Sequence, residues 1–406
     1  MPLETIADEV LDAIRAGGTY RQMRVLEGSQ GPRVRVDGRD VLLFAGSNYL
    51  DLAQHEAVVE ASIRAARESG CASGGSRLIS GNRAEHEALE AELAAFFGCE
   101  AGLAFNTGYM ANVGVIPSLL GPGDLLVSDA LGHASIVDGA RLSRAEVRVF
   151  PHNDLEALEA LLAAETAPSR RTLVAIDGLY SMDGDVAPIA EVVGLVRRYD
   201  CLVLLDDAHG TGTLGAGGRG SAERAGIDAG EIDILMGTLG KALGSFGAFV
   251  VGSHKLRDLL INTARSFIFS CALAPPQVAA ARAALSVVVT EPERRVALQR
   301  NAARLRDQLA RHGISTAPST THIIPVVLGD NATTMAICEG LLERGFYAQG
   351  IRHPSVPRGT ARLRITPMAT HSESEIDAIA QAIADQVAKY PAESIPALGN
   401  SPRQHS

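Results

Sequence analysis

CLVLLDDAHGTG, residues 201–212, is an apolar run of strand length that ends in Asp206, Asp207 and His209. The run does not alternate with polar residues, which is typical of a strand buried on both faces of a sheet. Similar runs occupy residues 101–105, 124–129, 146–150, 172–177 and 247–252. Between them, apolar residues recur at helical spacing in segments 85–98, 153–165 and 189–200. This order predicts an α/β fold with a mostly parallel sheet and a ligand at the carboxyl ends of its strands.

The predicted organisation is a large ligand-binding domain at 51–285, preceded by an N-terminal helix and strand segment at 1–50. After about residue 285 a small α/β domain at 286–392 is predicted. Its expected helices and strands alternate over 292–313, 322–329, 332–345, 361–366 and 372–390. The tail 393–406 holds Pro, Ser and Asn without periodicity, so it is predicted to be disordered.

Composition excludes several classes of partner. The net charge of -10 is spread along the 406 residues, and no Lys/Arg block is interleaved with aromatic residues, so nucleic acid is not expected. The five cysteines form no CxxC pair, which argues against a disulfide framework and indicates a reducing compartment. The N-terminus lacks the features of a signal peptide, and no segment reaches the ~18 apolar residues of a membrane span. We expect a cytoplasmic protein that binds small molecules.

Lys241 lies between glycines in the segment GTLGKALG, residues 237–244. Most lysines are solvated surface charges. Together with Asp206 and His209, however, this lysine fits pyridoxal phosphate, which needs an amine for its aldehyde and a counter-anion for its ring nitrogen. His209 would then bind the phenolic oxygen of the ring. Asp-Asp-x-His supplies at most two well-directed metal ligands, so no metal is expected.

The phosphate of such a cofactor is expected where a strand meets a helix, because the free amides of a helix start favour an anion. Thr107, Gly108 and Tyr109 occupy such a turn after the run 101–105. Thr238, three residues before Lys241, offers a hydroxyl. An ordinary loop and a strand-end threonine remain the alternative interpretations.

Eight motifs in order carry a resemblance to a known family. They are ASGGSRLISGN (72–82), NTGYMANVGVI (106–116), SDALGHASIVDGARLS (128–143), YSMDGDVAPI (180–189), DDAHGTGTLGAGGRG (206–220), TLGKALG (238–244), FIFSCALAPP (267–276) and VPRGTARLRITP (356–367). The chain resembles the α-oxoamine synthases, which are fold-type I, aspartate aminotransferase-like, pyridoxal phosphate-dependent transferases. The resemblance covers roughly residues 15–390.

The resemblance implies a role for each matched residue. Lys241 matches the lysine that binds the cofactor covalently, Asp206 the partner of its ring nitrogen, and His209 the partner of its phenolic oxygen. His133 matches the histidine stacked on the ring, and Gly108 and Tyr109 match the phosphate turn. The resemblance also assigns Ser181 to the lining of the site, Arg364 to the amino-acid carboxylate, and Arg21 to the substrate. Without the family, His133 would be a helix-start residue, Ser181 a turn serine and Arg364 a strand residue in a surface ion pair.

The segment 267–276 resembles the stretch that reaches the partner's cofactor across the family's dimer interface. A homodimer with shared active sites is therefore expected, with Ser270 or Cys271 near the neighbour's phosphate. An interior strand is the alternative for this segment.

The implied reaction is the decarboxylative condensation of an amino acid with an acyl thioester, which releases coenzyme A and carbon dioxide and gives an α-amino ketone. The motifs at 74–82 and 359–366 most resemble the branch that joins alanine to a pimeloyl thioester on the way to biotin. Residues 20–42 are closer in style to the glycine acetyltransferases, and a secondary-metabolism or sphingolipid-type synthase stays open. The donor is coenzyme A or an acyl carrier protein.

The segment AGSNYLDL, residues 45–52, departs from the family pattern. Ser47 stands where an asparagine is expected beside the amino acid, and Asp51 stands where a glycine is expected. Ser47 then leaves room for a larger substrate, or a shifted loop brings Asn48 to that place.

Two rival classes remain. One is an aminotransferase, which would need a second set of substrate-binding arginines. The other is a non-enzymatic protein in which 210–220 is a nucleotide-binding loop, although a lone glycine pattern is weak support.

Overall fold

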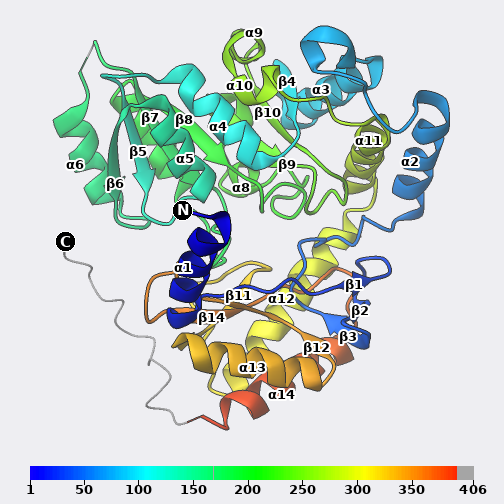
Figure 1. Ribbon diagram of the computed structural model, residues 1–406. Helices are drawn as coiled ribbons and strands as arrows, with labels where there is room; N and C mark the ends of the chain where they lie inside the picture. Colours follow the sequence, from blue (N-terminus) through cyan, green and yellow to red (C-terminus); the bar gives the residue numbers. More distant parts are fainter. Residues whose placement is uncertain (168, 391–406) are drawn as a thin grey trace. The chain divides into compact units, whose positions relative to one another are not determined.

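The computed structural model describes residues 1–167 and 169–390, so the predicted disordered tail lies outside the described residues. The chain divides into two compact units (Figure 1). The larger unit comprises Ser47–Ser181 and Asp185–Val296. The smaller unit comprises Met1–Gly46, Met182–Gly184 and the chain from Ala297 onward. The boundary between the units near residue 296 falls inside helix α12 (Glu293–Arg311).

The larger unit is built on a seven-stranded sheet of order β4-β10-β9-β8-β7-β5-β6. Strands β5 to β9 run parallel to one another, whereas β10 is antiparallel to both β4 and β9. The strands are β4 (Ala101–Phe105), β5 (Leu125–Asp129), β6 (Glu146–Phe150), β7 (Thr172–Asp177), β8 (Leu202–Asp206), β9 (Ile234–Thr238) and β10 (Ala248–Gly252). The predicted α/β class and mostly parallel sheet are confirmed.

Helices cover both faces of this sheet (Figure 1). They are α2 (Glu56–Ser69), α3 (Ala84–Phe97), α4 (Gly108–Leu119), α5 (Ala134–Ser143), α6 (Leu155–Glu165), α7 (Ile189–Arg198), α8 (Ser221–Arg224), α9 (His254–Thr263), α10 (Arg265–Ile268) and α11 (Pro275–Thr290). A π-helical turn, η1 (Arg77–Gly81), and a 3-10 turn, η2 (Ala229–Glu231), complete the unit.

Alternate strand residues form the two buried layers. Leu204, Met236 and Val250 belong to a core cluster that includes residues of α4, α5, α9 and α10. On the opposite face, Phe249 packs against Phe97 of α3, with ring centroids 5.4 Å apart. Residues of β4, β5, β7 and β10 are buried or nearly so along their whole length, which explains the unbroken apolar runs of the sequence.

The smaller unit contains a sheet of order β1-β2-β3-β12 and an antiparallel sheet of order β11-β14-β13. The strands are β1 (Leu26–Glu27), β2 (Arg33–Val36), β3 (Arg39–Leu43), β11 (Ile324–Gly329), β12 (Phe346–Tyr347), β13 (Gln349–Ile351) and β14 (Ala361–Ile365). The helices are α1 (Leu3–Ala16), most of α12, α13 (Asn331–Glu343) and α14 (Glu373–Val387). Leu305 of α12, Ile337 of α13 and Ile379 of α14 share a core with Leu363 of β14.

The structure contains a strand that the sequence did not predict, and it excludes one alternative interpretation. Strand β9, ILMGT, was not predicted, and it places the start of the lysine loop beside β8. The segment 267–276 is not an interior strand, because α10 ends at Ile268 and α11 begins at Pro275, with only a single bridge, from Cys271 to Ser76, between them.

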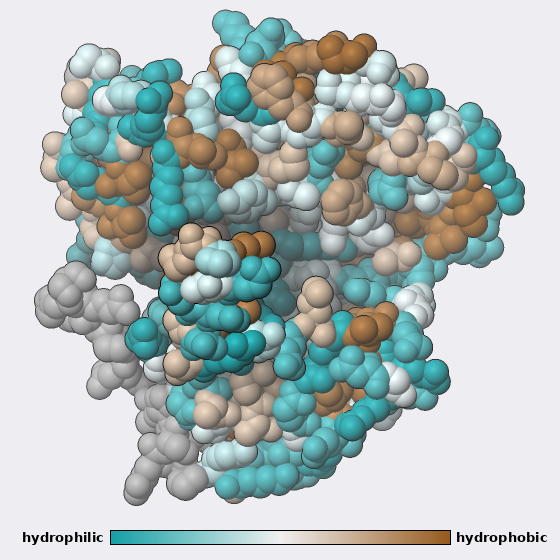
Figure 2. Space-filling view, in the orientation of Figure 1, coloured by the Kyte–Doolittle hydropathy of each residue, from teal (hydrophilic) through white to brown (hydrophobic). Residues whose placement is uncertain are grey.

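In residues 1–167 and 169–390, no helix combines the length and the apolar content that crossing a membrane requires. On the face drawn in Figure 2, hydrophobic side chains stand in separate groups among hydrophilic ones.

Candidate active site

Lys241 and His209 are brought together by the neighbouring strands β8 and β9. Asp206 is the last residue of β8, and Lys241 follows the end of β9 by three residues. The Nζ atom of Lys241 lies 3.0 Å from Nε2 of His209. The other ring nitrogen of His209, Nδ1, lies 2.7 Å from the hydroxyl of Tyr49. Tyr49 was not predicted as a site residue. The only indication in the sequence was its place in the segment 45–52, which departs from the family pattern.

Asp206 is a buried carboxylate held on both oxygens. Asn112 of α4 donates its amide to Oδ2 at 2.8 Å, and the backbone N–H of Ala208 donates to Oδ1 at 3.2 Å. Asp177 ends the neighbouring strand β7, in register with Asp206. Burial and the charge of Asp206 raise the pKa of Asp177 well above its ordinary value. Two carboxyl groups therefore lie side by side at this edge of the sheet, and the raised pKa of Asp177 disfavours its ionisation.

Asp207 organises the glycine-rich loop that follows β8. Its carboxylate accepts the N–H of Ser221 at 2.9 Å and the hydroxyl of Ser221 at 2.6 Å. A Cβ atom at Gly210 or Gly220 would overlap this carboxylate, so both positions require glycine. Burial raises the pKa of Asp207 to about 7.

A second carboxylate, that of Glu223, accepts backbone amides of the same loop. It binds the N–H of Gly217 at 3.0 Å and the N–H of Arg219 at 2.9 Å. These amides serve carboxylates of the chain itself, which argues against the interpretation of 210–220 as a nucleotide-binding loop.

The start of α4 has the features expected of an anion site. Thr107 is the N-cap, and its hydroxyl oxygen accepts the N–H of Met110 at 3.1 Å. Gly108 and Tyr109 are the first two helical residues, whose amides have no acceptor within a helix. The Tyr109 side chain is 47% exposed, and its hydroxyl donates to Asp138 at 2.6 Å.

His133 is the N-cap of α5 and is held from two sides. Its backbone N–H donates to Asp177 at 3.1 Å. Its Nδ1 lies 2.7 Å from the hydroxyl of Ser135 and accepts the Ser135 N–H at 3.2 Å. Burial, assisted by the charge of Lys241, lowers the pKa of His133 against the opposing effect of Asp206. The imidazole is therefore neutral at physiological pH.

The remaining predicted cofactor residues have the following places. Thr238 ends β9, where its hydroxyl donates to the carbonyl of Gly247 at 3.0 Å and accepts the N–H of Gly240 at 3.2 Å. Ser181 lies in the turn after β7 and is partly buried. Ser270 donates to the carbonyl of Ser266, at the end of α10. Cys271 is exposed.

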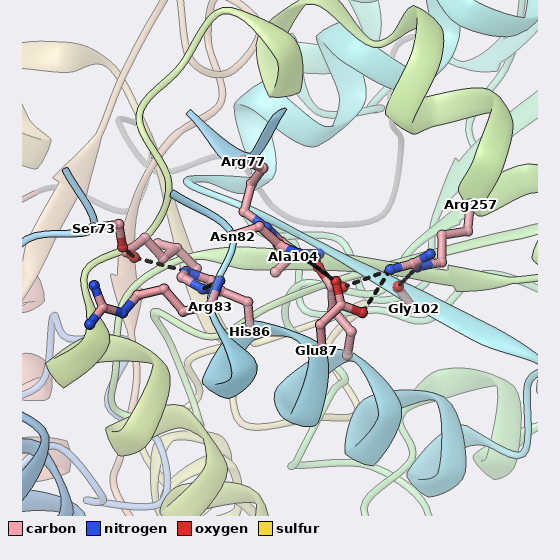
Figure 3. Close-up of polar contacts among 11 residues, drawn as sticks. Ser73, Arg77, Asn82, Arg83, His86, Glu87, Gly102, Ala104 and Arg257 are labelled. Carbon is pink, nitrogen blue, oxygen red and sulfur yellow. Dashed lines mark hydrogen bonds and ion pairs between the residues drawn. The ribbon is translucent and has the colours of Figure 1, made fainter. Parts of the chain in front are cut away.

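The motif at 72–82 is fixed by a buried ion pair between Arg77, which is labelled in Figure 3, and Glu90. Arg77 donates to both oxygens of Glu90, at 2.7 and 3.1 Å, and the two side chains are 7% and 3% exposed. Glu90 also accepts the N–H of Ala104 on β4 at 2.8 Å. Arg257 approaches the same carboxylate from the other side and donates to the carbonyl of Gly102. A buried pair of this kind is costly to break from one side only.

The same motif is joined to the segment 267–276. Ser73 and His86 both donate to the carbonyl of Leu273, the histidine at 2.9 Å. Ser76 and Cys271 form an isolated β-bridge. The motif at 72–82 and the segment 267–276, about 200 residues apart in the sequence, are therefore in direct contact.

In the segment 45–52, Asn48 is engaged in its own loop. Its side-chain oxygen accepts the N–H groups of Leu52 and Ala53 at 3.0 and 3.1 Å, and its amide donates to Asp51 at 3.1 Å. Asp51 has φ 57°, a left-handed conformation that explains why glycine is expected there. Ser47 is partly buried at the start of the larger unit.

Arg364 and Arg21 belong to the smaller unit. Arg364 lies on β14, and its residue is 8% exposed, so it is not the surface ion-pair residue that a strand arginine would otherwise be. Arg21 is exposed and donates to the hydroxyl of Ser355 at 3.4 Å. Within the described residues, no group of three or more His, Cys, Asp or Glu side chains could hold a metal ion.

Known proteins are similar to this chain along most of its length. The family model described as aminotransferase class I and II matches residues 39–383. The 8-amino-7-oxononanoate synthase of Geobacter sulfurreducens is 51% identical over 383 residues, covering 94% of this chain and 97% of the relative. That of Methylococcus capsulatus is 46% identical over 377 residues, covering 93% and 97%.

Among solved structures, a serine palmitoyltransferase from S. paucimobilis with a bound PLP-myriocin aldimine superposes with a TM-score of 0.90. It is 31% identical, and the match covers 96% of this chain and all of that one. The chain belongs to the α-oxoamine synthase family. Members of this family are pyridoxal phosphate-dependent acyltransferases, so the predicted fold type, cofactor and enzyme class are confirmed.

The residues of the larger unit fit the family's cofactor. Lys241 supplies an amine, Asp206 a buried carboxylate, and the start of α4 the backbone amides of Gly108 and Tyr109. They match the aldehyde, the ring nitrogen and the phosphate of pyridoxal phosphate respectively.

Proposed function

We propose that the protein is an 8-amino-7-oxononanoate synthase. It would join alanine to a pimeloyl thioester and release coenzyme A and carbon dioxide, with the α-amino ketone as product. The observation that supports this most is the curated relatives of that name, with 51% and 48% identity across 94% of the chain. Coenzyme A is the proposed carrier of the acyl group, and an acyl carrier protein is the alternative.

The proposed cofactor-binding residues act as follows. Pyridoxal phosphate, when bound, supplies an aldehyde for an amine and a ring that withdraws electrons from the substrate carbon. Lys241 is the amine that holds it covalently, and Asp206 keeps a proton on the ring nitrogen. The amides of Gly108 and Tyr109 bind the phosphate, and the hydroxyls of Thr107 and Thr238 line it.

The ring is packed and oriented by further side chains. His133 stacks on it, and neutral imidazole suits that place because it adds no charge opposing the ring proton. Ser181 lines the same site. In the dimer, Ser270 and Cys271 lie near the phosphate held by the partner subunit.

We propose that Lys241 also moves the proton of the reaction. Its free amine accepts the Cα proton of the amino acid at Nζ and later returns a proton to the product. The 3.0 Å contact with His209 links this amine to Tyr49 through the imidazole. When Nζ is an ammonium it donates to Nε2, which places the imidazole proton on Nδ1, facing Tyr49. The proton state of Lys241 is thereby coupled to the tautomer of His209.

Three further residues are proposed to hold the substrates. Arg364 binds the amino-acid carboxylate through a planar bidentate contact. Arg21 is a further substrate-binding residue. Ser47 lies beside the amino-acid side chain.

The proposal extends to assembly and location. The exposed side chains of Ile79 and Phe269, 84% and 70% exposed, favour a homodimer through the joined segments 72–82 and 267–276. A cytoplasmic location agrees with the five cysteines, all of which are free in the described residues.

The test of function measures coenzyme A release by the holoenzyme over a grid of alanine, glycine and serine against pimeloyl-, acetyl- and palmitoyl-coenzyme A. We expect the alanine and pimeloyl pair to give the highest kcat/KM, with 8-amino-7-oxononanoate identified by mass. Preference for glycine with acetyl-coenzyme A would instead assign a glycine C-acetyltransferase, and serine with palmitoyl-coenzyme A a sphingolipid-type synthase. Amino transfer to a keto acid without thiol release would assign an aminotransferase. Lys241→Ala is the inactive control.

A further inference from the structure

A hydrogen-bonded bridge connects Asp206 to His133 through two fully buried side chains. Asn112 of α4 and Ser135 of α5 are both 0% exposed. The Asn112 amide nitrogen donates to Oδ2 of Asp206 and to the hydroxyl of Ser135, each at 2.8 Å. The Ser135 hydroxyl lies 2.7 Å from Nδ1 of His133. Neither Asn112 nor Ser135 was predicted from the sequence.

The direction of each hydrogen bond follows from the donors available. The amide of Asn112 has two hydrogens, and both are used. Rotating the amide by half a turn would place its oxygen against a carboxylate, so the orientation is determined by Asp206. Since the Ser135 N–H also points at Nδ1 of His133, that nitrogen is an acceptor, and the Ser135 hydroxyl donates to it. His133 therefore carries its proton on Nε2.

The packing of the two helices makes this bridge possible. Gly139 of α5 faces α4, and a Cβ there would come within 2.8 Å of Ile116 and 3.0 Å of the Asn112 carbonyl oxygen. Glycine at this position lets α5 approach closely enough for Ser135 to reach Asn112. The side-chain oxygen of Asn112 has no hydrogen-bond partner among the described residues. Burying an amide oxygen without a hydrogen bond costs free energy. We therefore interpret Asn112 as a residue that serves the site through its two N–H donors rather than through its packing.

We propose that Asn112 is a positioning residue that holds Asp206 as an ionised carboxylate and, through Ser135, fixes His133 in one neutral tautomer. This inference rests on the proposed cofactor roles of Asp206 and His133. The donation to Oδ2 stabilises the charged form of Asp206, which is the form that keeps the ring nitrogen protonated. Asn112 would thus position both Asp206, which is proposed to contact the ring nitrogen, and His133, which is proposed to stack on the ring.

Other charged groups face Asp206 and must be included. The charge of Asp206 disfavours ionisation of Asp177 at the end of β7 and of Asp207 next in the chain, whereas Lys241 after β9 favours ionisation of both. Burial lowers the pKa of His133 at the start of α5. Removing the Asn112 donor leaves Asp206 beside two carboxyl groups with one fewer hydrogen bond, so its interaction with a protonated ring nitrogen should weaken.

The experiment compares Asn112→Ala and Ser135→Ala with Asn301→Ala. Asn301 is a matched control because it is also 0% exposed, donates through its amide to backbone carbonyls and has an unpaired side-chain oxygen in the described residues, but lies in the smaller unit. The readouts are the Kd for pyridoxal phosphate in reconstitution of the apoenzyme and the pH midpoint of the visible absorbance of the holoenzyme. Neither readout needs an acyl thioester, so failure of the proposed substrate would not affect them.

For Asn112→Ala we expect the Kd to rise about 10-fold or more, the scale of one hydrogen bond to a charged group, and the pH midpoint to move upward. Ser135→Ala should change the circular dichroism of the bound cofactor through His133, with less than about a threefold change in Kd. Asn301→Ala should lower the melting temperature and alter neither cofactor readout.

The variant Asn112→Leu provides a second test if the alanine variant does not fold. Leucine is close to asparagine in size and offers no hydrogen-bond donor to Asp206, so the pH midpoint should move upward as in Asn112→Ala. A Kd and a pH midpoint like those of the wild type in either foldable Asn112 variant would overturn the proposal and leave Asn112 as a packing residue.

Discussion

The carboxylates at the carboxyl ends of β7 and β8 differ in what they contact. Asp206 accepts hydrogen bonds from Asn112 and Ala208, and Asp207 accepts two from Ser221. Burial raises the pKa values of Asp177 and Asp207. The neighbours of each carboxyl group therefore differ, and Asp206 is the one proposed to serve a protonated ring nitrogen.

Replacing Asp206 with asparagine tests that assignment. In Asp206→Asn one of the two oxygens becomes an NH2 group, which must face either the Asn112 amide or the Ala208 N–H, and both are donors. A neutral amide also cannot hold the ring nitrogen protonated. We expect the cofactor to remain bound through Lys241 while kcat falls about 100-fold or more, from the loss of a charged hydrogen bond. Cofactor content and coenzyme A release measure the two effects, and near-normal turnover would remove Asp206 from the mechanism.

Ser47 and Asn48 can be separated by substrate preference and stability. The Asn48 side chain binds two backbone amides of its own loop, so Asn48→Ala should lower the free energy of unfolding by about 1–3 kcal/mol. Ser47→Asn should leave the fold intact and change the kcat/KM ratio between alanine, glycine and serine by about 1 kcal/mol or more. The ratio is measured for both variants beside a melting curve. An unchanged ratio in Ser47→Asn, with an altered ratio in a folded Asn48→Ala, would assign the pocket to Asn48.

The loops that follow β5, β6 and β7 are joined by one imidazole. His152, after β6, lies 2.9 Å from Asp129 at the end of β5 and 2.7 Å from Asp185 in the β7 to α7 connection. Burial opposes the charge of His152, but the hydrogen bonds that its ring donates to both aspartates, together with their charges, outweigh burial and raise the pKa of His152 to about 10. The charged side chain of His152 thus connects the loops after β5 and β7 through Asp129 and Asp185. These two loops carry His133 and Ser181.

The stability of this connection should depend on pH. Because the folded pKa of His152 lies above its unfolded value of about 6.5, its contribution is fully present below about pH 6.5 and is lost as pH rises through about 10. The variant His152→Gln should therefore be less stable than the wild type at pH 6, and the difference should shrink toward pH 10. Chemical denaturation at several pH values measures it. A difference independent of pH would show that the imidazole is not charged in the folded protein.

Much of the sheet was predictable because its strands are buried on both faces and leave an apolar signature. Strand β9 was missed because its five residues, ILMGT, include a glycine and merge with the lysine loop. The antiparallel direction of β10 was not predicted either, since an apolar run does not encode direction. The sequence motifs predicted roles for Lys241, Asp206 and His209, and the structure brings Lys241 and His209 into contact. Tyr49, Asn112 and Ser135 were not, because their significance lies in contacts between elements far apart in sequence.

For the protein as a whole, the joined segments 72–82 and 267–276 indicate how two copies would associate. The π-helical turn η1 packs against α10, and the Arg77–Glu90 pair fixes it from inside the unit. On the outside, Leu78, Ile79 and Phe269 are 52%, 84% and 70% exposed. Single exposed apolar residues are normal, but neighbouring ones on two connected segments are typical of an interface.

We expect the protein to sediment at twice the chain mass of 42.6 kDa. The double variant Ile79→Asp and Phe269→Asp should become monomeric, because charges buried in an apolar interface are costly. Val149→Asp is the control: Val149 is 59% exposed on the edge strand β6, away from both segments in sequence, and its variant should stay dimeric. Since Ser270 and Cys271 are proposed to reach the partner's phosphate, the monomer should also bind pyridoxal phosphate more weakly and lose most turnover. Analytical ultracentrifugation and cofactor titration measure the two effects, and a monomeric double variant with full activity would contradict shared active sites.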